Sequence, residues 1–120
     1  MNKRAVGGEK EEIAVNYLKE NGVEIILRNF SGRNGEIDII GDDGKTLVFI
    51  EVKYRKNSSM GSAEESISKS KMKKIYLTAV EYIRKNSSIA ERNMRFDVIA
   101  INGEKINWIK NSFWGDEIGF

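Results

Sequence analysis

The stretch of residues 35–55 constrains the fold of this chain more than any other. Two strand-like segments, residues 35–42 and 45–55, flank the dipeptide Asp43-Gly44. Asp-Gly between apolar runs is a strong signal for a tight β-hairpin. A two-residue loop at this dipeptide predicts that Asp42 pairs with Lys45. Residues 47–50 are apolar on both faces of their strand, which is typical of a strand covered on two sides. The hairpin is therefore expected to lie inside a layered sheet.

Four charged side chains interrupt this hairpin: Glu36, Asp38, Glu51 and Lys53. The predicted register places Glu36 opposite Glu51 and Asp38 diagonal to it, so all four converge on one side. Carboxylates that face one another away from water repel strongly, and a bound Mg²⁺ or Mn²⁺ would remove that penalty. The alternative is a solvated strand face on which Lys53 pairs with Glu36 or Glu51. The pattern alone leaves both interpretations open.

Composition limits the chemistry that this chain could perform. The 120 residues, 40% hydrophobic and 32% charged, are expected to form a single soluble domain over residues 1–120. Roughly the last six residues are expected to form a flexible tail. The absence of cysteine and histidine excludes disulfides, thiolate nucleophiles and imidazole catalysis. No apolar run could span a membrane and no signal-peptide pattern is visible, so we expect a cytoplasmic protein without a membrane partner.

The basic residues are distributed unevenly, although the net charge is only +2. Lys69, Lys71, Lys73 and Lys74 are grouped, and Arg28, Arg33, Arg55 and Lys56 lie elsewhere. A basic surface around an acidic pocket would suit a phosphate backbone that approaches a metal. The alternative for the lysine group is the solvated start of a helix.

The remaining segments predict helices on a mixed sheet. Residues 9–21 read as a helix in which Glu11 lies at the edge of the apolar stripe, where geometry alone favours a flanking surface glutamate over an inward-facing one. Strands are expected at residues 23–30, 95–101 and 105–109, and a second helix at residues 68–85. The inward face of that second helix is expected to comprise Met72, Ile75, Leu77, Ala79, Val80 and Ile83. This helix would be the crossover to a strand parallel to the central strand of the hairpin.

An ordered set of motifs resembles the YraN-like family of small bacterial proteins over about residues 7–110. The motifs are Glu11-x-x-Ala14-x-x-Tyr17-Leu18, Arg28-Asn29-Phe30, Gly35-Glu36-Ile37-Asp38, Phe49-Ile50-Glu51-Val52-Lys53-Tyr54-Arg55, Lys71 and Arg95-Phe96-Asp97-Val98. That family in turn resembles the PD-(D/E)xK nuclease superfamily and its archaeal Holliday-junction resolvases. The resemblance implies an α/β fold with a restriction-endonuclease-like core, a mixed β-sheet flanked by helices in α-β-β-β-α-β order.

The same resemblance implies roles for particular residues. Asp38, Glu51 and Lys53 match the catalytic positions of the superfamily, and Glu11 matches a helix glutamate that joins Asp38 and Glu51 as a metal ligand. Resolvases of similar fold act as homodimers, so a homodimer is a candidate assembly.

Together these observations predict an Mg²⁺- or Mn²⁺-dependent endonuclease that hydrolyses phosphodiester bonds in structured or branched DNA. Glu36 is expected to lie next to the metal ligands without binding the metal, or to pair with Lys53. Lys71, Arg55 and Arg33 are candidates for contacts with backbone phosphates. The first alternative is a catalytically silent nucleic-acid-binding or assembly module with the same fold. The second is a structural or protein-interaction domain whose charges are merely solvated.

Overall fold

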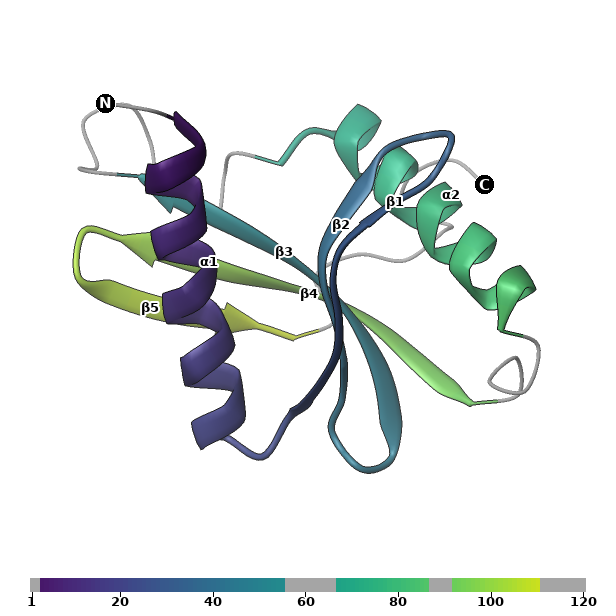
Figure 1. Ribbon diagram of the computed structural model, residues 1–120, viewed down its shortest axis with the longest axis horizontal. Helices are drawn as coiled ribbons and strands as arrows, with labels where there is room; N and C mark the ends of the chain where they lie inside the picture. Colours follow the sequence, from purple (N-terminus) through teal and green to yellow (C-terminus); the bar gives the residue numbers. More distant parts are fainter. Residues whose placement is uncertain (1–2, 56–66, 87–91, 111–120) are drawn as a thin grey trace.

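A computed structural model describes residues 3–55, 67–86 and 92–110 of the chain. The elements within these ranges are α1 (Lys3–Glu20), β1 (Glu24–Ser31), β2 (Glu36–Asp42), β3 (Thr46–Arg55), α2 (Lys69–Lys85), β4 (Asn93–Asn102) and β5 (Lys105–Ile109) (Figure 1). The expected order of elements is confirmed, and α1 begins earlier than the predicted Glu9. The expected C-terminal tail lies outside the described residues. Within the described residues, no helix combines the length and the hydropathy needed to cross a bilayer.

The five strands form one mixed sheet in the order β1-β2-β3-β4-β5. Strands β1, β2 and β3 are antiparallel neighbours, β3 and β4 are parallel, and β5 returns antiparallel to β4. The parallel pair requires a crossover, and α2 lies in this connection as the sequence predicted. The hairpin strand β3 is consequently the centre of the sheet.

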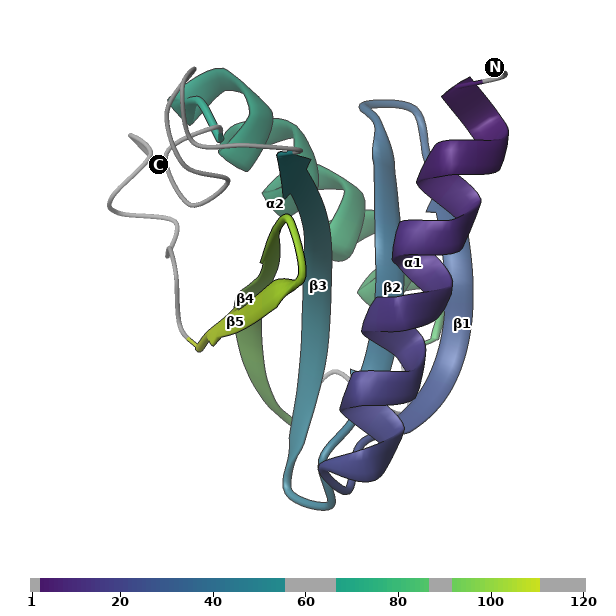
Figure 2. The same ribbon diagram turned by 90° about the vertical axis from the view of Figure 1, so that its left-hand side faces the viewer.

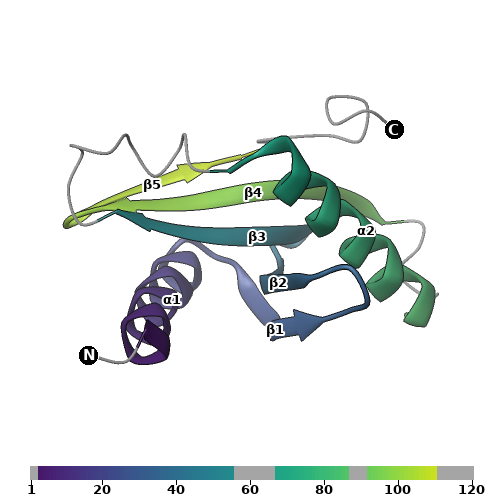
Figure 3. The same cartoon turned by 90° about the horizontal axis from the view of Figure 1, so that it is seen from above.

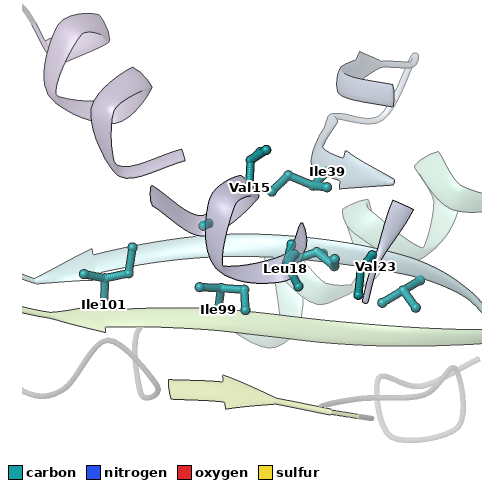
Figure 4. Close-up of a cluster of buried hydrophobic side chains, with 9 residues drawn as sticks. Val15, Leu18, Val23, Ile39, Ile99 and Ile101 are labelled. Atoms are coloured by element: carbon teal, nitrogen blue, oxygen red, sulfur yellow. The ribbon is translucent and has the colours of Figure 1, made fainter. Parts of the chain in front are cut away.

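Each helix covers one face of the sheet, and alternate residues of β3 supply the two cores (Figure 3). On the α1 side, Val48 and Ile50 pack with Val15 and Leu18 of the helix; Figure 4 shows part of this cluster. On the α2 side, Leu47 and Phe49 pack with α2 residues that include Ile75, Ala79 and Tyr82. Residues 47–50 of β3 are all buried, which explains why this run is apolar on both faces.

The hairpin turn lies one residue later than the sequence suggested. Asp42 pairs with Leu47 rather than with Lys45, and Gly44 adopts a positive φ of 100° in the loop. The carboxylate of Asp42 accepts a hydrogen bond from the Gly44 amide, and that of Asp43 accepts bonds from the Lys45 and Thr46 amides. These side-chain caps stabilise the displaced turn, since aspartates commonly bond to backbone amides two residues on. The predicted register is therefore wrong by two residues.

Strands β2 and β3 separate beyond the pair Ile39–Ile50, where their register ends, although both strands continue. Figure 2 shows β2 and β3 spreading apart away from the hairpin turn. Asp38 on β2 and Glu51 on β3 are the first residues beyond that pair. The charged residues of the hairpin thus lie where the sheet forks.

Helix α2 departs from expectation on its outer side. The side chain of Ser68 caps the start of the helix by accepting a hydrogen bond from the Lys71 amide over 3.1 Å. Leu77 and Val80, however, are only half-buried and belong to none of the core clusters. The predicted inward face was too wide, because the sheet below α2 is already covered by Ile75, Ala79 and Tyr82.

Candidate functional site

A pair of carboxylates, Asp38 and Glu51, lies at the fork of the sheet. The backbone amide of Val52 donates a hydrogen bond to Asp38 Oδ2 over 2.8 Å. This bond replaces a strand-to-strand bond that β2 no longer provides, and it fixes the Asp38 carboxylate beside β3. The side chain of Glu51 is only 6% exposed. Glu51 Oε2 is buried and has no hydrogen-bond partner among the described residues.

Burial makes this pair hard to ionise. It raises the pKa of Glu51 from an ordinary 4.5 to about 8, with the negative charge of Asp38 as the next cause and Lys71 and Lys53 opposing it. Burial also raises the pKa of Asp38, against the lowering effect of the Val52 amide. A buried carboxylate beside a half-buried one favours a shared proton or a bound cation, because each disfavours ionisation of the other.

Two lysine ammonium groups approach Glu51 from different elements. Lys53 Nζ on β3 and Lys71 Nζ on α2 each lie 3.7 Å from Glu51 Oε1. Lys53 was predicted at the carboxylates from strand alternation. Lys71 was predicted only as a phosphate contact, because its distance from the hairpin in sequence hides that α2 crosses over the fork.

Glu11 approaches the carboxylate pair from α1 but is engaged by other groups. Its Oε1 accepts hydrogen bonds from Arg28 Nε over 3.2 Å and from Asn29 Nδ2 over 3.0 Å. The charge of Glu11 contributes to the raised pKa of Asp38. Within the described residues, no three histidine, cysteine, aspartate or glutamate side chains form a group that could hold a metal ion. Asp38 and Glu51 are therefore brought together, and Glu11 as a third ligand stays a prediction.

The other predicted residues lie around this centre. Glu36 is exposed and pairs with Ser31 of β1, so the expected position opposite Glu51 is wrong. The β2–β3 register ends at Ile39–Ile50, and Asp38 is the next residue of β2 beyond it. Arg33 is exposed in the loop before β2, and Arg55 is exposed at the end of β3.

A second charged cluster, which the sequence analysis did not assign to a site, lies on the opposite face of the sheet. Asp97 is fully buried and accepts hydrogen bonds from Arg95 Nε over 2.9 Å and from Trp108 Nε1 over 2.8 Å. It pairs in register with Ile50, which faces α1, whereas Glu51 faces α2. The i, i+2 spacing of Arg95 and Asp97 on a strand was the available signal. This cluster ties β5 to β4 and leaves the carboxylate pair untouched.

The fold and the site define a small α/β protein whose sheet forks at a pair of carboxylates, the buried Glu51 and the half-buried Asp38, flanked by two lysines. The chain belongs to the Uncharacterised protein family UPF0102, whose sequence model matches residues 10–101. This membership confirms the resemblance to the YraN-like family.

Relatives match over nearly the whole chain. A UPF0102 protein of Fusobacterium nucleatum is 40% identical over 120 residues, which cover 100% of both chains. A UPF0102 protein of Vibrio campbellii is 43% identical over 113 residues, with 92% of this chain and 93% of the relative covered. A UPF0102 protein of Aliivibrio fischeri is 44% identical over 114 residues, with the same coverage.

Proposed function

We propose that this protein is a metal-dependent endonuclease that hydrolyses phosphodiester bonds in structured or branched DNA. The observation that carries the proposal is the pairing of Asp38 with Glu51, whose Oε2 is buried without a partner among the described residues. Two carboxylates with an unfilled oxygen fit a hard divalent cation. Mg²⁺ is commonly held by one or two carboxylates together with water and substrate phosphate, so a third protein ligand is not required.

In this proposal Asp38 and Glu51 hold Mg²⁺ or Mn²⁺, and the resemblance to PD-(D/E)xK nucleases suggests Glu11 as a further donor. When bound, such a cation lowers the pKa of a coordinated water and offsets negative charge on phosphoryl oxygens. The Val52 amide holds Asp38 in one orientation, which limits the reorganisation needed to bind the cation.

Lys53 and Lys71 have related roles in this proposal. Without a cation, Lys53 and Lys71 are both 3.7 Å from Glu51 and partly offset its charge. A cation bound to Glu51 would take over that task and leave both ammonium groups available to a phosphate or an attacking water. Lys71 thereby joins Lys53 at the reacting centre instead of contacting only the flanking backbone.

Cleavage of branched and linear DNA with Mg²⁺ or Mn²⁺ tests the proposal. We expect cutting by the parent protein, no cutting by Asp38→Ala or Glu51→Gln, and undiminished cutting by the matched control Glu104→Gln, whose side chain is exposed in the β4–β5 turn. Isothermal titration with Mn²⁺ should show binding that Glu51→Gln abolishes. Cutting that survives both substitutions would remove this mechanism.

One observation favours the silent binding module as a second candidate. Only two acidic side chains gather at the fork, since the described residues contain no group of three potential ligands. This alternative predicts DNA binding with steep salt dependence and no metal-dependent cutting.

A further inference from the structure

An open groove of about 400 Å³ lies between the loop before β2 and the outer side of α2. Arg33 lines it from the loop, and Leu77, Val80, Glu81, Arg84 and Lys85 line it from the helix. The helix residues follow i, i+3 and i+4 spacing, so they share one face of α2. That face points away from the core, which makes its two apolar members unexplained by packing.

The groove is held in shape by contacts between the loop and the helix. Glu81 Oε2 accepts a hydrogen bond from the Arg33 amide over 2.9 Å. The loop is closed by a 2.8 Å bond from the Gly32 amide to the Gly35 carbonyl. A side chain at Gly32 would meet the carboxylate of Glu81 and displace it from the Arg33 amide, so glycine favours this contact. These contacts join the loop to the helix in the absence of a ligand.

Positive charge dominates the groove. Glu81 is its one carboxylate among the lining residues, and that group bonds to the Arg33 amide and lies 3.9 Å from Lys85 Nζ. The guanidinium groups of Arg33 and Arg84 form no ion pair with any residue in the described part of the chain. Leu77 and Val80 provide an apolar wall beside these cations. This combination suits a chain that alternates anionic phosphates with apolar sugar and base surfaces.

The groove lies within a few nucleotides' length of the carboxylate pair, so one strand could contact both. Lys71 reaches Glu51 from the start of α2, and Leu77 and Arg84 follow on the same helix. At 1.5 Å per residue they lie about 10 to 20 Å further along the helix axis. With a rise of 3.4 Å per nucleotide, that distance corresponds to about three to six nucleotides.

We infer that this groove binds the sugar–phosphate backbone of a nucleic acid strand about three to six nucleotides from the carboxylate pair, with phosphates at Arg33 and Arg84 and apolar surface against Leu77 and Val80. The inference rests on the proposed function and extends it, because it names a second contact for the same substrate. Binding at this groove does not require hydrolysis.

The test measures the binding of fluorescein-labelled branched DNA in EDTA at several salt concentrations. The variant Arg33→Ala/Arg84→Ala is compared with Lys19→Ala/Lys45→Ala, which removes the same charge from exposed positions at the end of α1 and in the hairpin turn. Each lost phosphate contact should reduce the slope of log K against log salt by about 0.7 to 0.9. We expect a reduction of about 1.4 to 1.8 for the groove variant and no change for the control.

A second measurement locates the DNA directly. The chain has no cysteine, so Arg84→Cys and Lys19→Cys each offer one site for a benzophenone photocrosslinker. Crosslinking to DNA from position 84 and not from position 19 is expected. Equal salt slopes for the two double variants would overturn the inference. So would crosslinking from position 84 to poly-aspartate, offered as a second anionic polymer, instead of to DNA. Binding through the groove without any cutting would contradict the proposed hydrolysis and leave the groove inference standing.

Discussion

The backbone amide of Val52 donates a hydrogen bond to Asp38 Oδ2 over 2.8 Å at the point where β2 leaves β3. A side chain thus accepts the bond that the neighbouring strand would otherwise accept. The fork of the sheet and the orientation of Asp38 therefore have one physical cause, since a buried amide must find an acceptor.

The Val52–Asp38 bond predicts different stabilities for two variants of Asp38. Asp38→Asn keeps an oxygen that can accept the bond, whereas Asp38→Ala leaves the amide without its side-chain acceptor. We expect Asp38→Ala to be about 1 to 3 kcal/mol less stable than Asp38→Asn. Urea unfolding at pH 8 measures the difference. Equal free energies of unfolding would show that the bond does not stabilise the fold.

The raised pKa of Glu51 predicts that stability depends on pH. Between an unfolded pKa near 4.5 and a folded pKa of about 8, the folded protein binds more protons than the unfolded chain. The free energy of unfolding should therefore fall as pH rises through this window, by about 1.4 kcal/mol for each unit of pKa difference. Stabilisation by protonation of Glu51 is fully present below pH 4.5 and lost above pH 8.

Denaturant unfolding at several pH values, without divalent cations, measures this dependence. Glu51→Gln should flatten the slope, and the exposed control Glu104→Gln should leave it unchanged. Added Mn²⁺ should stabilise the parent protein more at pH 8 than at pH 5, because protons and the cation compete for Glu51. A slope that Glu51→Gln leaves intact would assign the pH dependence to other groups.

The two lysines should have separable effects on Glu51. Both oppose the rise in the pKa of Glu51, with Lys71 the larger contributor. Lys71→Met should therefore raise the pKa of Glu51 further, and by at least as much as Lys53→Met. Carboxyl carbon NMR titration measures both shifts. The control Lys69→Met, exposed on the same helix, should leave the pKa of Glu51 unchanged. A pKa shift from Lys69→Met as large as that from Lys71→Met would refute a specific contact between Lys71 and Glu51.

The buried cluster around Asp97 should control stability without affecting the site. Asp97→Ala leaves Arg95 and Trp108 without a shared acceptor. Arg95 keeps its 2.9 Å contact with Asp43, so the loss of the Asp97 acceptor should cost about 1 to 3 kcal/mol, which urea unfolding would detect. Trp108→Phe removes one hydrogen bond and should cost less, about 0.5 to 1.5 kcal/mol. The titration of Glu51 should not change in either variant, because the cluster lies on the α1 side of the sheet.

Sequence patterns predicted the order of elements because they depend on local chemistry. The alternating and two-sided apolar runs identified the strands, and Ser68 marked the start of α2. The helix between the hairpin and β4 predicted the parallel pair, since such a connection is long and right-handed. The same patterns singled out Asp38, Glu51 and Lys53 as charges in an apolar setting.

The hairpin register and the role of Lys71 were beyond those patterns. Asp42 and Asp43 both accept hydrogen bonds from amides of the turn, and together they favour a longer loop than the two-residue turn that Asp43-Gly44 suggests. The position of Lys71 depends on how α2 crosses the sheet, and its residue number carries no information about that crossing.

By itself, the sequence determined which segments are strands and helices, and it singled out Asp38, Glu51 and Lys53 as charges within apolar strands. Only the tertiary structure decided that β2 and β3 part beyond Ile39 and Ile50, that α2 brings a second ammonium to Glu51, and that Leu77 and Val80 line a cationic groove. The physical reason is that secondary structure follows from neighbours along the chain. The meeting of charges from three elements depends on how the layers pack.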